Sequence, residues 1–286
     1  LALPSERTMR RQLKRIVVPA VDKVFIRHMK QAEATVRTSN IAGIDIAVDG
    51  RYSHVGRTAP NCTVPFVDIE SNLIIHVKNM HKDMPGIDGV SGRMEKEGVR
   101  MGLRELQAKQ LVITSLVSDN DAKISKMMRE LFPGIHHHLD FWHIVKNLNK
   151  ALRELTKRKD CPHIEHWRRE LIDHCYFVHG KFEKDRKKGV EYMKSSLAHV
   201  TGWHKHFEKV PFLKGISECL HNALPDASDH EIDPKSTEFA HLKEVILKPS
   251  FIVALERASP KKNTSPCEWF NSLLNIYAPK RIARLV

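Results

Sequence analysis

The sequence predicts an α/β protein with a mixed β-sheet of five strands, flanked by helices, and a helical insertion late in the chain. Two observations lead to this fold class. Between residues 41 and 79, short apolar runs are separated by polar turn residues, which is typical of antiparallel strands. Between residues 111 and 148, β-branched apolar runs alternate with amphipathic segments, which is typical of parallel strands connected by helices.

The length and composition are those of a globular protein. The chain has 286 residues, of which 41% are hydrophobic and 28% are charged, so it can bury a core. No apolar run is long enough for a membrane helix, and no signal segment opens the chain. The five scattered cysteines indicate a reducing compartment rather than a disulfide framework. Because the chain begins at Leu1, we expect it to be a piece of a longer protein.

The excess of positive charge favours a polyanionic partner. The formal net charge is +13, and basic side chains gain affinity for nucleic acids by releasing counterions from phosphates. A basic protein with a merely solvated surface is the alternative. The N-terminal segment, residues 1–40, is predicted to be a basic helix that either follows a phosphate backbone or packs on the protein. Pro19 is expected to end or kink it.

Residues 41–149 are predicted to form the first part of the core. The expected elements are strands at 41–48, 63–67 and 73–77, a helix at 92–108, a strand at 111–117, a helix at 122–131, a strand at 135–139 and a further helix. The first three strands read as an antiparallel meander, with a turn from Gly50 to Ser53. The order is therefore βββαβαβα.

The rest of the chain is predicted to be helical. Residues 150–262 are rich in Lys, Glu, His and Leu at helical spacing, and we expect an all-helical insertion there. Residues 263–286 should complete the core with a last helix that starts near Pro266. Ser265 is a plausible N-cap of this helix, and Glu268 falls in its first turn, where an acid suits the helix dipole.

Three carboxylates stand where strands end or a helix begins: Asp49, Asp119 and Glu268. Side chains at the carboxyl edge of such a sheet can converge, and grouped carboxylates repel one another unless divalent cations bind. Two Mg²⁺ or Mn²⁺ ions could then support phosphodiester chemistry. Each acid also has an ordinary interpretation as a turn residue, a helix cap or a first-turn acid. Asp45 and Asp121 are neighbouring alternatives that we rank lower.

The element order is the one expected of a ribonuclease-H-like sheet, and the sequence resembles the DDE transposases of that superfamily, particularly the Mutator-like and related eukaryotic ones. The residues that carry the resemblance are Val48-Asp49-Gly50-Arg51, Leu116-Val117-Ser118-Asp119, Asp140-Phe141-Trp142-His143 with the following Ile144 to Leu148, and Cys267 to Leu274 with Pro279-Lys280-Arg281 beyond. The Asp-x-x-His block at a strand-to-helix junction is the most specific of these motifs.

The resemblance implies a site, an activity and partners. Asp49, Asp119 and Glu268 match the metal-binding triad, and Asp140 and His143 match the C/D-x-x-H element that shapes the site and contacts DNA. The implied activity is DNA cleavage and strand transfer with two Mg²⁺ or Mn²⁺ ions, in the nucleus, by a homodimer or higher oligomer on DNA. The alternative is a catalytically inactive, domesticated relative that binds DNA or chromatin. The sequence has no recognisable zinc-finger DNA-binding domain.

A zinc site in the predicted insertion is a weaker interpretation. The residues that suggest it are Cys161, His163, His166, His174, Cys175 and His179. They lack the C-x2-C pair that a structural zinc site usually has, so we prefer to interpret them as packing residues.

Overall fold

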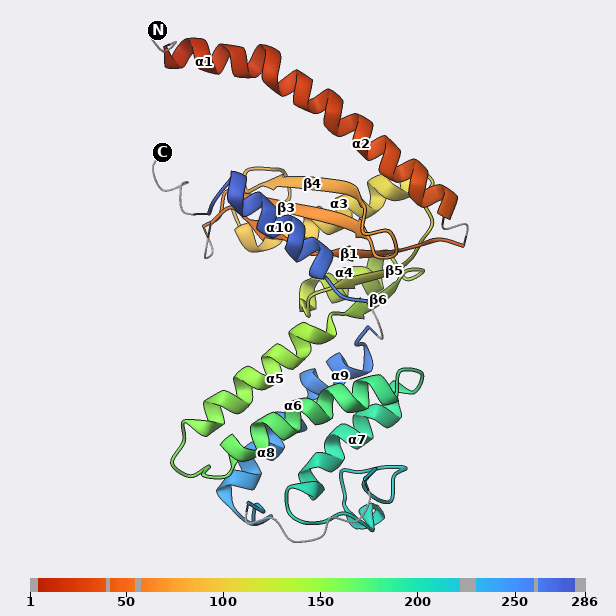
Figure 1. Cartoon of the computed structure of the whole chain (residues 1–286), viewed down its shortest axis with the longest axis vertical. Coiled ribbons are helices and arrows are strands. Elements are labelled where there is room, and N and C mark those ends of the chain that lie inside the picture. Colours follow the sequence, from red (N-terminus) through yellow and green to blue (C-terminus); the bar gives the residue numbers. More distant parts are fainter. Residues whose placement is uncertain (1–4, 40–41, 55–57, 222–229, 260–261, 281–286) are drawn as a thin grey trace. The chain divides into compact units, whose positions relative to one another are not determined.

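The computed structural model describes residues 5–39, 42–54, 58–221, 230–259 and 262–280. It confirms an α/β fold with a mixed sheet, of the kind that the sequence predicts, and the sheet is compatible with a ribonuclease-H-like fold (Figure 1). The strands are β1 Ile44–Val48, β2 Arg51–Tyr52, β3 Asn61–Asp68, β4 Ile74–His81, β5 Ile113–Ser118 and β6 His136–Leu139. Their order is β2-β3-β1-β5-β6, with β4 also paired to β3, and β1, β5 and β6 are parallel.

The helices follow the predicted order. They are α1 Glu6–Gln12, α2 Val18–Ser39, α3 Met94–Ala108, α4 Ala122–Leu131, α5 Phe141–Thr156, α6 Ile164–Lys181, α7 Arg186–His199, α8 Thr237–Ile246, α9 Pro249–Glu256 and α10 Ser265–Tyr277, with short helical turns η1 Leu13–Val17, η2 Ser91–Arg93 and η3 Phe207–Lys209. No helix in the described part of the chain combines the length and apolar character that a bilayer-spanning segment requires.

The chain divides into two compact units. Unit 1 comprises residues 1–116, 122–136 and 264–286, and unit 2 comprises residues 117–121 and 137–263. Unit 2 is helical, and its core joins apolar side chains of α5 to α9, among them Leu152, Leu171, Met193, Leu242 and Leu255. The predicted boundaries at 150 and 262 stay predictions.

In unit 1, alternate side chains of the strands point to opposite faces of the sheet. Ile46 and Val48 of β1 join a large core with α3 and α4, whereas Ala47 between them packs on Cys267 of α10. Figure 1 shows α3 and α10 on opposite faces of these strands. This alternation explains how α10, encoded at the end of the chain, completes a sheet that begins at residue 44.

Two glycines let α3 approach the sheet closely. A Cβ on Gly98 would lie 2.9 Å from a methyl carbon of Val64, and a Cβ on Gly102 would lie 2.2 Å from the ring of Phe66. Phe66 is fully buried, so its ring has no room to move away. The glycines are therefore needed for contact, although glycine normally weakens a helix.

The N-terminal helix does not end at Pro19, which corrects one of the two predicted outcomes, and a kink there stays a prediction. The helix continues from Glu6 to Ser39, with the π-helical turn η1 directly before the proline. Proline lacks an N–H and clashes with the carbonyl group four residues earlier. In η1 the N–H of Val18 donates to the carbonyl of Leu13, five residues back, and this wider turn accommodates the proline within the helix.

We predict that Gly102→Ala destabilises unit 1 by about 1–3 kcal/mol, because the added methyl group overpacks the core against Phe66. Thermal and urea unfolding measure the change. Gly92→Ala is the control, since the nearest atom to its added Cβ is the flexible Nζ of Lys123 at 3.5 Å. Equal stability of the two variants would contradict the packing argument.

Candidate functional site

Asp49 and Gly50 interrupt one continuous strand. Ile46, Ala47 and Val48 pair with Asp68, Val67 and Phe66, and the same register resumes at Arg51 and Tyr52 opposite Thr63 and Cys62. The prediction of a turn from Gly50 to Ser53 is therefore corrected, because Arg51 and Tyr52 form the strand β2. Asp49 and Gly50 therefore lie outside the regular strand pairing, although β1 and β2 on either side both pair with β3.

Helix α10 lies against this break. The side-chain amide of Asn271 donates to Asp49 Oδ2 at 2.9 Å and to the Asp49 carbonyl at 3.3 Å. Glu268 stands three residues earlier, so it lies on the same face of the helix as Asn271. Unit 1 thus brings Asp49 and Glu268 to one region, although they are far apart in the sequence.

The start of α10 differs slightly from the prediction. Its first residue is Ser265, and Thr264 occupies the N-cap position without a side-chain cap bond. Pro266 stands in the first turn, where it needs no N–H partner. Glu268 is in the first turn, as predicted.

Arg51 binds the C-terminal end of α10. Its guanidinium is buried and donates from Nε to Asn275 Oδ1 at 2.9 Å and from a terminal nitrogen to the carbonyl of Ala278. The motif Asp49-Gly50-Arg51 therefore contacts α10 at its middle and at its C-terminal end. Of the basic pair that follows the helix, Lys280 is described, and Arg281 lies outside the described residues.

The surroundings of Asp49 are acidic. Glu95, in the first turn of α3, accepts a hydrogen bond from the Gly50 N–H at 3.2 Å. Burial, together with the negative charges of Glu95 and Asp49, raises the pKa of the Cys62 thiol well above its usual range. The positive charge of Lys280 opposes this rise in the pKa.

Unit 2 contains the remaining predicted residues. Asp140 is the N-cap of α5, accepts a hydrogen bond from the Trp142 N–H at 2.8 Å and donates its own N–H to the Ser118 carbonyl. His143 Nδ1 lies 3.0 Å from Asp119 Oδ1 and 3.5 Å from Asp140 Oδ2. The Asp-x-x-His spacing therefore places the N-cap carboxylate and the His143 ring side by side in the first turn of α5.

The two lower-ranked acids have structural contacts. Asp45 lies within β1 and accepts hydrogen bonds from the hydroxyl groups of Thr114, at 2.9 Å, and Ser115. Asp121 precedes α4, and its N–H donates to the Asp119 carbonyl.

Asn271 and Glu95 were missed by sequence reasoning. Asn271 could have been found from its position one helical turn after Glu268, but an asparagine at that spacing is a weak signal. Glu95 stands in an ordinary charged helix, and only the close approach of α3 to Gly50 gives it a place near Asp49.

The histidines and cysteines between 161 and 179 take part in packing and hydrogen bonding within unit 2. Cys161 and Cys175 are buried in the core. His163 Nδ1 lies 2.9 Å from Glu238 Oε2, and the His174 ring contacts the Tyr192 carbonyl at 2.8 Å. This agrees with the interpretation as packing residues.

The side-chain oxygens near Asp49 are of the chemical kind that a hard divalent cation prefers. Carboxylate and amide oxygens are the ligands that Mg²⁺ and Mn²⁺ prefer. Asn271 Oδ1 is buried and has no hydrogen-bond partner among the described residues, while its amide nitrogen is held by Asp49. A buried carbonyl oxygen without a partner is costly, and a bound cation would satisfy it.

No protein-family model, curated protein or solved structure matches this chain.

We predict that Arg51→Ala frees the C-terminal half of α10. The variant loses hydrogen bonds from a buried guanidinium, and such charge-assisted bonds contribute about 1.5–3 kcal/mol each. Hydrogen exchange of the amides of residues 273–277 should become at least about tenfold faster. Arg10→Ala, at a side chain 75% exposed, is the control and should leave this exchange unchanged. Unaltered protection in Arg51→Ala would show that packing alone holds the helix.

Proposed function

We propose that this chain is the catalytic part of a DDE transposase-like protein that cleaves a DNA phosphodiester bond and transfers the freed 3′-hydroxyl end to a target. The observation that carries the proposal is the hydrogen bond from Asn271 to Asp49, which fixes the helix of Glu268 beside the break in the first strand. The motifs quoted above and the strand order support it. Assembly as a homodimer or higher oligomer on DNA and a nuclear location belong to the same proposal.

Three acids would hold the metal ions in this proposal. Asp49 and Glu268 would act from unit 1, and Asp119 follows β5, the parallel neighbour of β1 in the sheet. Two Mg²⁺ or Mn²⁺ ions, when bound, activate the attacking oxygen and stabilise the leaving oxygen. Asn271 would orient Asp49, and His143 would orient Asp119. Asp140 would keep α5 and His143 in place.

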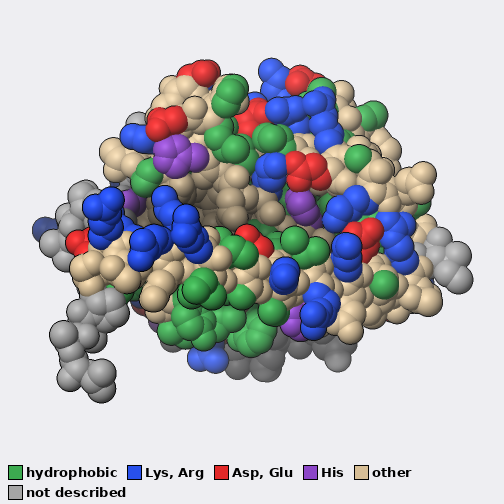
Figure 2. Space-filling model, turned by 90° about the horizontal axis from the view of Figure 1, so that it is seen from above, with side chains coloured by type: hydrophobic (Ala, Val, Ile, Leu, Met, Phe, Trp, Pro, Cys, Tyr) green, Lys and Arg blue, Asp and Glu red, His purple; other side chains and the backbone are tan. Residues whose placement is uncertain are grey.

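A basic face on α5 supports DNA as the partner. Lys146, Lys150, Arg153 and Lys157 are exposed and spaced to lie on one side of the helix, opposite its buried apolar residues. Together with Arg168 they line a hollow on unit 2, in which Glu154 pairs with Lys157 and Glu165 pairs with Arg168. Lys146 also lies over the exposed ring of Trp142, 4.5 Å from its centre. Basic side chains are spread over the face shown in Figure 2 as well.

A non-catalytic DNA-binding protein on the same scaffold is the second candidate. The observation that favours it is the contact of Asp119 with His143, since a protonated imidazole would neutralise that carboxylate without a metal. The two candidates share the DNA partner and differ only in cleavage.

We predict that Asp49→Asn, Asp119→Asn and Glu268→Gln each lower Mg²⁺-dependent DNA cleavage by at least about 100-fold, because each removes a charge that holds a metal ion. A nicking assay on supercoiled DNA, followed by strand-transfer analysis, measures the effect. Glu70→Gln, at an exposed turn residue, is the matched control. Binding without cleavage by the unmodified chain would favour the second candidate, and full activity of the three variants would refute the triad.

We predict that DNA binding weakens steeply with salt. Replacing Lys146, Lys150 and Arg153 by alanine should reduce the slope of log K against log salt by about 2–3, since each lost phosphate contact removes about 0.9. Fluorescence anisotropy at several salt concentrations measures the slope. The control replaces three exposed lysines before and in α7, namely Lys184, Lys187 and Lys188. Equal slopes for the two triple variants would exclude α5 as the DNA-binding face.

A further inference from the structure

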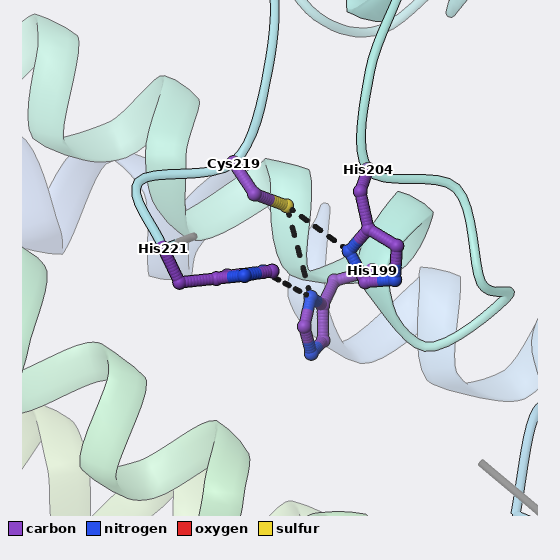
Figure 3. A group of neighbouring side chains, drawn as sticks. All are labelled: His199, His204, Cys219 and His221. Atoms are coloured by element: carbon purple, nitrogen blue, oxygen red, sulfur yellow. Dashed lines mark hydrogen bonds between the residues drawn. The ribbon is translucent and has the colours of Figure 1, made fainter. Parts of the chain in front are cut away.

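A group of histidine and cysteine side chains in unit 2 meets at one point. Its members are His199, His204, Cys219 and His221, and Figure 3 shows their rings and sulfur directed toward one another. One ligand atom of each lies within 4.8 Å of the corresponding atoms of the others. None of the four belongs to the acidic site or to the His/Cys group between 161 and 179.

The local fold explains how these residues meet. His199 ends α7, and the chain then turns through Gly202, whose φ of +73° suits glycine. His204 and Cys219 face each other across a loop. The Cys219 N–H donates to the His204 carbonyl at 2.9 Å, and the backbones of Lys205 and Glu218 form an isolated antiparallel β-bridge. His221 follows two residues later.

The distances match the edges of a metal-centred tetrahedron. Zn–S bonds of about 2.3 Å and Zn–N bonds of about 2.0–2.1 Å place sulfur about 3.6 Å from nitrogen and nitrogens about 3.3–3.4 Å apart. Cys219 Sγ lies 3.6 Å from His204 Nδ1 and 3.7 Å from His199 Nδ1. His221 Nε2 lies 3.2 Å from His199 Nδ1.

Hydrogen bonds alone do not explain why these four side chains lie so close together. His199 Nδ1 faces both the sulfur of Cys219 and the Nε2 of His221. A neutral imidazole nitrogen either donates one proton or accepts one, so it cannot bond well to two such groups in the same direction. A cation at the centre would use the lone pairs of all four groups at once.

The segment that carries these residues has little regular structure. Between α7 and α8, the described residues 200–221 and 230–236 contain the short turn η3 and one isolated bridge. Long irregular segments are uncommon in compact domains, and a metal clip that closes such a loop offsets its entropy. His199, Cys219 and His221 also line a hollow, through which an ion could enter from solvent.

We propose a structural zinc site that fastens the segment between α7 and α8 to the end of α7. Its four ligands are His199, His204, Cys219 and His221. One thiolate and three imidazoles are borderline ligands that suit Zn²⁺, and four protein ligands close the tetrahedron. The spacing His-x4-His is usual for zinc, whereas Cys-x-His is not, and for this reason a search for C-x2-C pairs misses the site.

The test measures metal binding by the full chain. After purification without added metal, elemental analysis and titration with Zn²⁺ against a chromophoric chelator should give one tightly bound ion per chain. Co²⁺ in its place should produce the intense visible bands of a tetrahedral ion and a sulfur-to-metal charge-transfer band. Removing the metal should lower the Tm of the helical unit by more than about 5 °C.

Variants assign the ligands. Cys219→Ser and His204→Asn should weaken Zn²⁺ binding by about 100-fold or more, and Cys219→Ser should lose the charge-transfer band. His206→Asn is the matched control, because His206 is exposed in the same loop and asparagine tolerates its left-handed backbone (φ +60°). Its affinity should be unchanged.

Three results would overturn the proposal. They are no bound Zn²⁺, a Co²⁺ spectrum without a sulfur band, and equal affinity of the unmodified chain and Cys219→Ser. The cobalt spectrum of the unmodified chain decides the matter on its own if a variant does not fold.

Discussion

The packing of α10 on β1 is the contact on which the candidate acidic site depends. It joins the end of the chain to its first strand through one hydrogen-bonded pair, Asn271 and Asp49, and one buried cation, Arg51. The small side chains of Ala47 and Cys267 let the helix approach the sheet. This contact helps to fix Glu268 relative to Asp49, because Asn271 stands one helical turn after Glu268 on the same helix.

The contact also explains why the strand is interrupted at Asp49. A regular β-residue directs its side chain straight up or down from the sheet and uses its backbone in the ladder. Here the backbone carbonyl of Asp49 is turned toward Asn271, and the Gly50 N–H is turned toward Glu95. A Cβ on Gly50 would lie 2.6 Å from the Glu95 side chain, so a larger residue here would require Glu95 to move. The interruption of the strand at Asp49 and Gly50 thus coincides with the contacts that these two residues make with α10 and α3.

The sequence predicts those parts of the fold in which hydrophobic residues recur with a clear strand or helix period. The strands β1, β3, β4, β5 and β6 and the helices α3 and α4 carry strong alternation or amphipathicity, and their predicted positions are confirmed. β2 is missed because two residues beside Asp-Gly have a turn composition, while their strand partner is distant in sequence. The continuation through Pro19 is missed because a π-turn has no pattern of its own. Asn271 and the group around Cys219 are missed because only tertiary packing brings their atoms together.

The two candidate metal sites differ in the chemistry of their donors, and this difference would direct different metals to them. Around Asp49 the donors are oxygens, which bind Mg²⁺ with its water shell but have no strong preference among divalent ions. Around Cys219 the donors are nitrogen and sulfur, which bind Zn²⁺ far more tightly than Mg²⁺. At cellular concentrations magnesium is abundant and free zinc is scarce, so the nitrogen–sulfur group would take the zinc and leave the oxygen group to magnesium. Under these two proposals, the chain would hold zinc for structure and could exchange magnesium at its acidic site without losing the fold of its helical unit.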